Sequence, residues 1–182
     1  MDYYYLVAAL PTLSLESESA PITMDEFVER CRDHLTGADR KGLEQILLRP
    51  NEGRTHPFVR RWQEKDAQLR NAVARSRAGR LGVDPSEHVR EEAEYSPEAE
   101  RAASEAFSST DPVEREKALD RFRWSEIDAL AGFNPFAGRA VLAYGLKLAL
   151  VERWMAMNER EGEQRAEEIA HARPGPEGTP QP

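Results

Sequence analysis

The sequence predicts an all-α protein, and three observations lead to that class. Several segments repeat apolar residues every three or four positions, which is the spacing of one face of an amphipathic helix. Helix-start patterns precede some of these segments, and no segment alternates apolar and polar residues as a half-buried strand does. With 182 residues, 40% of them hydrophobic, the chain can bury a core as a compact multi-helix bundle.

The first expected helices lie before residue 49. Residues 2–10, DYYYLVAAL, carry apolar side chains on every side and are expected to be buried. The segment is too short for its pattern to separate helix from strand, and we favour helix because the segments after it are predicted to be helical. Thr23 and Glu26 form the pattern of a capping box, which predicts a helix over 24–35. A short helix is expected to follow from Thr36. The residues expected to face inward from these last two helices are Phe27, Val28, Cys31, Leu35, Leu43, Ile46 and Leu47.

The middle of the chain is expected to hold one long helix. Residues 49–57, RPNEGRTHP, predict a loop because two prolines and a glycine interrupt regular structure. The long helix covers about 57–80, and Gly82 is suited to the left-handed conformation that closes a helix. Its inward residues are Phe58, Trp62, Leu69 and Val73. The segment 84–109 is acidic and alanine-rich, and its weak apolar pattern predicts only partial helix.

Two further helices are expected toward the C-terminus. Asp111-Pro112-Val113-Glu114 predicts a helix start, with aspartate as the cap and proline at the first helical position, and this helix runs to about residue 130. Its inward residues are Leu119, Phe122, Ile127 and Leu130. The last long helix covers about 137–160 and a polar helical extension follows Gly162. Because residues 140–151 are apolar almost all round, we expect neighbouring helices to enclose them.

The expected organisation is one helical domain over residues 1–172, either undivided or divided into two sub-lobes that meet near 49–57. Residues 173–182, RPGPEGTPQP, contain too few apolar side chains to form a core and are predicted to be disordered. The apolar run 140–151 contains Lys147 and is too short for a bilayer, which needs about 20 residues. The single cysteine and the absence of a secretory leader favour a cytoplasmic location.

The sequence contains no recognisable catalytic pattern. The four histidines are scattered among polar neighbours, without the spacing of a metal site: they are His34, His56, His88 and His171. A glycine-rich phosphate loop, a Gly-x-Ser-x-Gly elbow and a Cys-x-x-Cys pair are absent. We therefore expect a protein that is not an enzyme and that uses no cofactor or metal. The charged runs 114–116 and 167–168 are expected to be solvated.

The net charge of −8 is unevenly distributed along the chain. Residues 49–80 contain nine Arg or Lys against three acids, whereas residues 84–128 contain 14 acids against six bases. Two interpretations are open. The two stretches can attract one another across an antiparallel helix pair, or the first can present a basic patch to an acidic partner.

Three arginines of the basic stretch fall on one helix face. At about 100° per residue, Arg70, Arg77 and Arg80 occupy one sector, and Arg75 lies outside it. Clustered arginines can also contact nucleic-acid phosphates. Three roles are therefore open for these arginines: pairing within the chain, contact with a partner protein and nucleic-acid binding. The negative net charge and the lack of aromatic residues beside them make nucleic-acid binding the least favoured.

Four segments, taken in order, resemble a known bacterial family. They are YYYLVAALPTLSL, QLRNAVARSRAGRLG, DPVEREKALDRFRWSEIDAL and VLAYGLKLALVERWMAMNEREG. Together they look like domain-of-unknown-function family 2764. That family is similar to the component of V/A-type rotary ATPases known as C or d, which we call the C/d component. The helix from Leu142 to Glu152, with its Leu-Ala-Tyr start, is similar to one near the C-terminus of the C/d component.

The resemblance implies a non-catalytic helical protein of a bacterial V/A-type rotary ATPase. The C/d component joins the central stalk to the membrane rotor ring on the cytoplasmic side, while ATP hydrolysis and ion transport belong to other subunits. The expected partners are therefore the rotor-ring and central-stalk subunits, with the inner membrane reached only through the complex. The candidate partner contacts are Arg70, Arg77, Arg80, Arg123, Lys147 and Arg153.

The length of the chain leaves two alternatives open. Proteins of the C/d type are usually much longer and built from three similar lobes, so a stable subunit and an assembly factor are both compatible with the resemblance. A free-standing helical scaffold or regulatory interaction protein, without any ATPase association, is the alternative function.

Overall fold

The computed structural model describes residues 2–17, 19–48, 55–90 and 93–172, with side chains as far as residue 158. Within these ranges the chain forms seven α-helices, one short 3-10 helix and no strand, so the predicted all-α class is confirmed. The α-helices are α1 (Tyr4–Ala9), α2 (Met24–Arg32), α3 (Gly37–Leu48), α4 (Pro57–Leu81), α5 (Pro97–Ala106), α6 (Pro112–Ala131) and α7 (Gly138–Ala172). The 3-10 helix is Ser86–His88.

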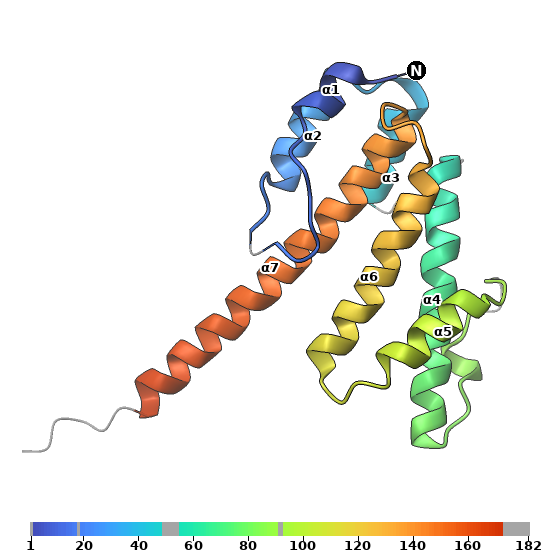
Figure 1. The fold of residues 1–182 in the computed structure, drawn as a ribbon, viewed down its shortest axis with the longest axis vertical. Coiled ribbons are helices and arrows are strands. Elements are labelled where there is room, and N and C mark those ends of the chain that lie inside the picture. The colour runs from blue at the N-terminus through green and yellow to red at the C-terminus, as the bar shows by residue number, and fades with distance from the viewer. Residues whose placement is uncertain (1, 18, 49–54, 91–92, 173–182) are drawn as a thin grey trace, which may run out of the picture.

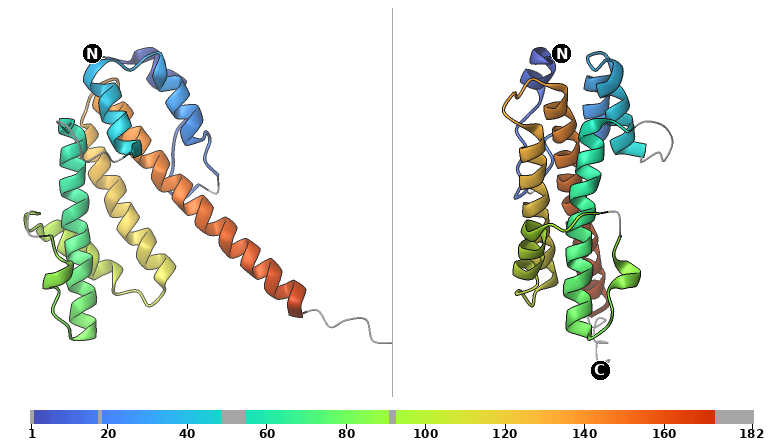
Figure 2. Two further views of the ribbon diagram at one scale, coloured as in Figure 1. Left: turned by 180° about the vertical axis from the view of Figure 1, so that it is seen from behind. Right: turned by 90° about the vertical axis from the view of Figure 1, so that its right-hand side faces the viewer.

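Helix α7 is the longest element and organises the fold (Figure 1). Helices α2, α3 and α6 pack against its N-terminal half. Helices α4, α5 and α6 contact one another in all three pairs and form the other side of the molecule. The C-terminal half of α7 projects away from the other helices, as Figure 1 and the left view of Figure 2 show.

The apolar interior consists of two clusters of buried side chains. The first surrounds the N-terminal half of α7 and includes Leu6, Phe27, Leu35, Leu43, Phe58, Ile127, Val141, Leu142 and Leu148. The second lies among α4, α5 and α6 and is rich in alanine: Leu69, Ala72, Ala99, Ala103, Ala106 and Leu119. Both α4 and α6 contribute to the two clusters, which joins the two sides of the molecule.

The prediction that neighbours enclose the apolar part of α7 is confirmed. Val141, Leu142 and Leu148 are fully buried, and Trp154 is 7% exposed. At Gly145 the neighbouring helix comes very close, because a Cβ atom there would lie 2.9 Å from Phe27 Cε1. The helix continues through residue 162 without interruption, so the expected core helix and polar extension are one element.

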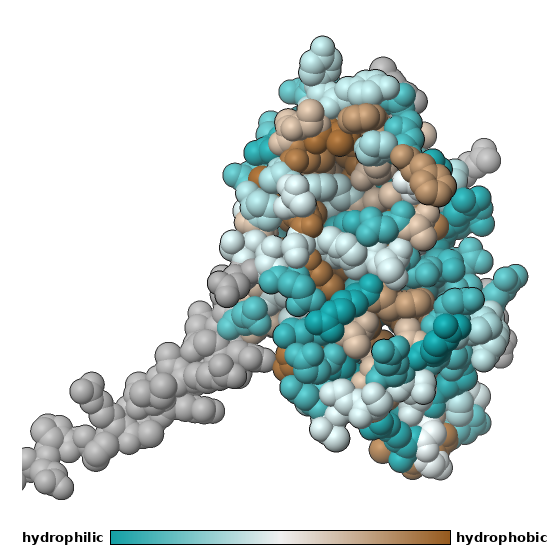
Figure 3. All heavy atoms as spheres, in the orientation of Figure 1, coloured by the Kyte–Doolittle hydropathy of each residue, from teal (hydrophilic) through white to brown (hydrophobic). Residues whose placement is uncertain are grey.

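The opening segment is less buried than the sequence predicts. Tyr3 and Leu6 are buried, but Tyr4 is 55% and Tyr5 88% exposed, because a helix of six residues offers one face to the core. Leu47, expected to face inward, is 38% exposed. Figure 3 shows an apolar surface area at the α1 end of the molecule. Among the described residues, no helix has the length and apolar character needed to span a bilayer.

The helix ends follow the predicted capping patterns. Thr23 and Glu26 form the reciprocal capping box of α2, with Thr23 N–H donating to Glu26 Oε2 at 2.8 Å. Gly82 closes α4 with a φ of 67°, in the left-handed region that glycine adopts without strain. Residues 49–54, where a loop was predicted, and 173–182, predicted to be disordered, lie outside the described residues.

Asp111 is the cap of α6, and its removal is expected to destabilise the protein measurably. Its Oδ1 accepts a hydrogen bond from Val113 N–H at 2.8 Å. Asp111→Ala leaves that N–H without its partner, and we expect a loss of about 1 kcal/mol in unfolding free energy. Asp111→Asn keeps an acceptor at the same position and is the matched control. Urea denaturation of both variants checks the prediction, and equal losses would contradict it.

Burial of Cys31 is expected to make stability fall at high pH. Burial raises the pKa of the Cys31 thiol from 9.0 to about 12. Between these two values the folded chain binds more protons than the unfolded chain, so unfolding free energy declines as pH rises from about 9 to about 12. Burial likewise raises the pKa of Tyr144 to about 12, and its contribution has the same sign.

The Cys31→Ala variant separates the two contributions. Its unfolding free energy should decline less steeply than that of the wild type over the same pH range. The measurement is denaturant unfolding at a series of pH values. Parallel curves for the two proteins would show that the thiol titrates alike in the folded and unfolded chains.

Candidate functional site

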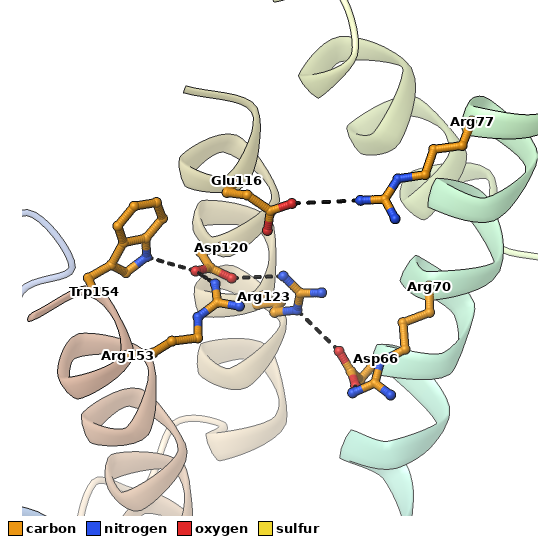
Figure 4. Close-up of polar contacts among 8 residues, drawn as sticks. All are labelled: Asp66, Arg70, Arg77, Glu116, Asp120, Arg123, Arg153 and Trp154. Carbon is orange, nitrogen blue, oxygen red and sulfur yellow. Dashed lines mark hydrogen bonds and ion pairs between the residues drawn. The ribbon is translucent and has the colours of Figure 1, made fainter. Parts of the chain in front are cut away.

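A buried carboxylate on α6 is the centre of a polar network that joins three helices (Figure 4). The side chain of Asp120 has no exposed surface. Its Oδ1 accepts from Arg123 Nη1 at 2.8 Å, and its Oδ2 accepts from Trp154 Nε1 at 2.8 Å. Arg153, which precedes Trp154 on α7, also donates to Oδ2. A charge that is fully removed from water is stable only with such compensation.

The network continues from α6 to α4 through Arg123. Its Nε donates to Asp66 Oδ1 at 3.1 Å, and Asp66 Oδ2 lies 2.6 Å from Arg70 Nη2. Burial by itself lowers the pKa of Arg123, but the hydrogen bonds and charges of Asp120 and Asp66 outweigh it and raise that pKa above its usual value. The guanidinium of Arg123 therefore stays charged and connects two carboxylates from different helices.

A second group of arginines surrounds the ring of Phe107, which follows α5. The guanidinium carbons of Arg77, Arg80 and Arg115 lie 6.0, 5.3 and 4.6 Å from the ring centroid. The Nη2 atom of Arg77 also lies 4.0 Å from Oε1 of Glu116 on α6. The prediction that residues 114–116 are all solvated is wrong for Arg115, because its side chain lies over this ring and is half-buried.

The basic and acidic stretches of the sequence meet across the α4–α5–α6 side of the molecule. Lys65 on α4 pairs with Glu126 on α6 at 2.9 Å, and Arg75 pairs with Glu100 on α5. Helices α4 and α6 run in opposite directions, as the colours in Figure 1 show. The interpretation that the two stretches attract one another within the chain is therefore confirmed.

Three of the six candidate contacts belong to the network around Asp120, namely Arg70, Arg123 and Arg153, and Arg77 forms a separate pair with Glu116 in the same view (Figure 4). Arg77 is the most accessible of these, with 60% of its side chain exposed, and Arg123 the least, with 15%. Lys147 lies elsewhere, where it pairs with Asp128 and sits 4.6 Å above the centroid of the Trp124 ring. Arg123 and Lys147 are therefore mainly engaged within the chain.

The sequence prediction missed the carboxylates that hold these arginines. Asp120 looked like one of many charged residues on a helix face, yet it lies seven positions before the fully buried Ile127 and so on the same side of α6. A charged residue in register with core positions was the available signal. Asp66 carried the same signal, because it lies three positions before the fully buried Leu69 on α4, although its partner Arg123 lies 57 positions away.

A groove lies between α4 and α6, beside this network, and we call it the α4–α6 groove. Its volume is about 570 Å³. The lining residues are Arg70, Val73, Ala74, Arg77, Ala78, Leu81, Val83, His88, Glu116, Leu119 and Arg123. In the part of the chain that the structure describes, no group of three or more His, Cys, Asp or Glu residues is placed to hold a metal ion. The groove offers apolar surface and arginine donors, which are features of a binding surface.

Part of the chain matches a known protein family. Residues 100–172 match the family described as "Protein of unknown function (DUF2764)". The matched segment comprises most of α5 and all of α6 and α7, and it contains Asp120, Arg123 and Arg153. It agrees with the family resemblance predicted from the sequence. Comparison with curated proteins and with solved structures gave no match.

Proposed function

We propose that this chain is a non-catalytic helical subunit or accessory protein of a bacterial V/A-type rotary ATPase, in which it links the central stalk to the membrane rotor ring. The observation that supports it most is α7, a continuous helix of 35 residues. At 1.5 Å per residue such a helix extends roughly 50 Å. A protein that transmits torque between two partners needs a stiff element of this kind that is anchored in a folded body.

The anchoring of α7 fits this mechanical role. Its N-terminal half is buried in the larger core cluster. At the level where α7 leaves the body, Arg153 and Trp154 hold it to the buried Asp120. These polar groups can pair in a single arrangement of the two helices. A shift of α7 is therefore unfavourable, because it would leave a charge buried without its partners.

Two sequence features support the same proposal. The family match covers α7 throughout its length. The segment that resembles a helix of the C/d component, from Leu142 to Glu152, is the anchored part of α7. Exposed arginines such as Arg70 and Arg77 provide electrostatic contacts that allow a complex to assemble and dissociate.

Purification of the ATPase from its own membranes tests the proposal. With an affinity tag on a catalytic subunit, we expect this chain to co-purify with the intact enzyme in a fixed ratio to the central-stalk subunits. Deletion of its gene is expected to abolish ATP-driven ion transport by the assembled enzyme. A fully active, coupled enzyme that lacks this chain would contradict the proposal.

The same purification separates the remaining alternatives. Presence in partly assembled complexes and absence from the finished enzyme identifies an assembly factor. Complexes of the tagged chain that contain no ATPase component identify the alternative function, a free-standing helical scaffold or regulatory protein.

A further inference from the structure

The α4–α6 groove has apolar residues that the fold leaves uncovered. Leu81, the last residue of α4, is 75% exposed, and Val83 is 55% exposed. Both line the groove together with Leu119 of α6, which also belongs to the second core cluster. Apolar side chains that continue a core outward to solvent are typical of a surface that a partner covers.

Arginines of α4 border this apolar surface on one side. Arg70 and Arg77 line the groove, with 46% and 60% of their side chains exposed, whereas Arg80, three residues after Arg77, does not line it. Arg70 is paired with Asp66, but the nearest carboxylate to Arg77 is Glu116 at 4.0 Å. Arg80 lies over an aromatic ring and, within the described residues, has no carboxylate partner.

The α4–α6 groove is lined by residues of α4, of α6 and of the segment that follows α4. Helices α4, α5 and α6 form a three-helix unit whose small core consists largely of alanines. No α5 residue lines the groove, so α5 covers one side of the α4–α6 pair and the groove opens on another. A helix laid into it would complete a four-helix arrangement and bury the uncovered apolar residues.

We infer that the α4–α6 groove binds an acidic amphipathic helix of a partner protein. Leucine-like side chains on one face of that helix would contact Leu81 and Val83, and its carboxylates would bond to Arg77 on the groove rim. A partner strand is a poorer fit, because the described part of the chain has no sheet edge to pair with it. The inference rests on the proposed adaptor function and specifies the chemistry of one partner contact.

A designed peptide provides the direct test on the full-length chain. The probe is a fluorescein-labelled helix of about five turns with leucines on one face and glutamates on the other. Two matched peptides replace the glutamates by lysines or the leucines by serines. We expect fluorescence anisotropy to report binding of the Leu/Glu peptide, with an affinity that falls as salt is added. The other two peptides are expected to bind with at least roughly tenfold lower affinity than the Leu/Glu peptide.

Two charge reversals locate the binding site. Arg77→Glu places a negative charge on the groove rim and is expected to lower the affinity for the Leu/Glu peptide by at least about tenfold. Arg121→Glu is the matched control, because Arg121 is 51% exposed, pairs with Glu16 and does not line the groove. Circular dichroism verifies that both variants keep their helix content, and the control is expected to bind as the wild type does.

Three results would overturn the inference: equal binding of the Leu/Lys peptide, equal binding of the Ser/Glu peptide, or an unchanged affinity in Arg77→Glu. Dimerisation of the chain in sedimentation experiments, lost in Arg77→Glu, would assign the groove to a second copy and would equally overturn it. If the peptide does not bind but the chain still co-purifies with the ATPase, the inferred groove contact is wrong and the proposed function stands. If the peptide binds but the chain does not co-purify with the ATPase, the proposed function is wrong and the groove remains a binding site.

Discussion

Asp120→Asn is expected to lower the free energy of unfolding by about 3–5 kcal/mol, the cost of removing one partner from a buried ionic cluster. The carboxylate has no exposed surface and is shared by Arg123, Arg153 and Trp154. Asparagine has nearly the same shape but no charge, so Arg153 loses its counterion and Arg123 keeps only Asp66. Urea denaturation followed by circular dichroism measures the loss.

A matched control separates the buried carboxylate from an ordinary surface ion pair. Asp128, on the same helix, pairs with Lys147, but its side chain is 56% exposed. Asp128→Asn is therefore expected to change the unfolding free energy by less than about 1 kcal/mol. Similar small losses in the two variants would mean that Asp120 does not anchor α7.

A double-mutant cycle tests the link between α6 and α7 itself. Arg153→Met removes the guanidinium while keeping much of its apolar stem. Because Asp120 and Arg153 are in direct contact, the two losses should not add, and a coupling of about 0.5–3 kcal/mol is expected. Additive losses would show that the two residues act independently.

Phe27→Ala is expected to cost about 3–5 kcal/mol, the range for truncating a buried phenylalanine. Phe27 of α2 has no exposed surface, and its ring centroid lies 5.2 Å from that of Tyr144 on α7. The ring also packs against Gly145, where no side chain separates the two helices. Truncation would leave a cavity at the α2–α7 contact that the surrounding helices can fill only in part.

Phe133→Ala is the control for this truncation, because Phe133 is fully exposed. It removes the same side chain and should change the unfolding free energy by no more than about 0.5 kcal/mol. Thermal or urea denaturation of the two variants compares them directly. A loss below about 1 kcal/mol for Phe27→Ala would contradict tight packing of α2 on α7.

Local patterns in the sequence predict most helices correctly. The capping box at Thr23, the aspartate–proline start at 111–112 and the closing glycine at 82 all act within one turn of the chain, and each was confirmed. The apolar stripe of α7 needs only its own spacing to be recognised. Helix α5 was harder, because its core residues are alanines, which stand out little from a polar background.

Long-range pairing could not be predicted in the same way. Asp120 is a charged residue in a charged helix until α7 returns and places Arg153 and Trp154 beside it. The same folding leaves Arg77 and Leu81 open at the groove, whereas Arg123 becomes largely inaccessible.

The sequence by itself determined the all-α class, the ends of the capped helices and the enclosed character of α7, because spacing and capping depend on neighbours within a few residues. Only the tertiary structure decided which arginines are buried against carboxylates and which remain exposed at the surface. The physical reason is that the energy of a charge depends on its surroundings, and those surroundings come from helices distant in the chain.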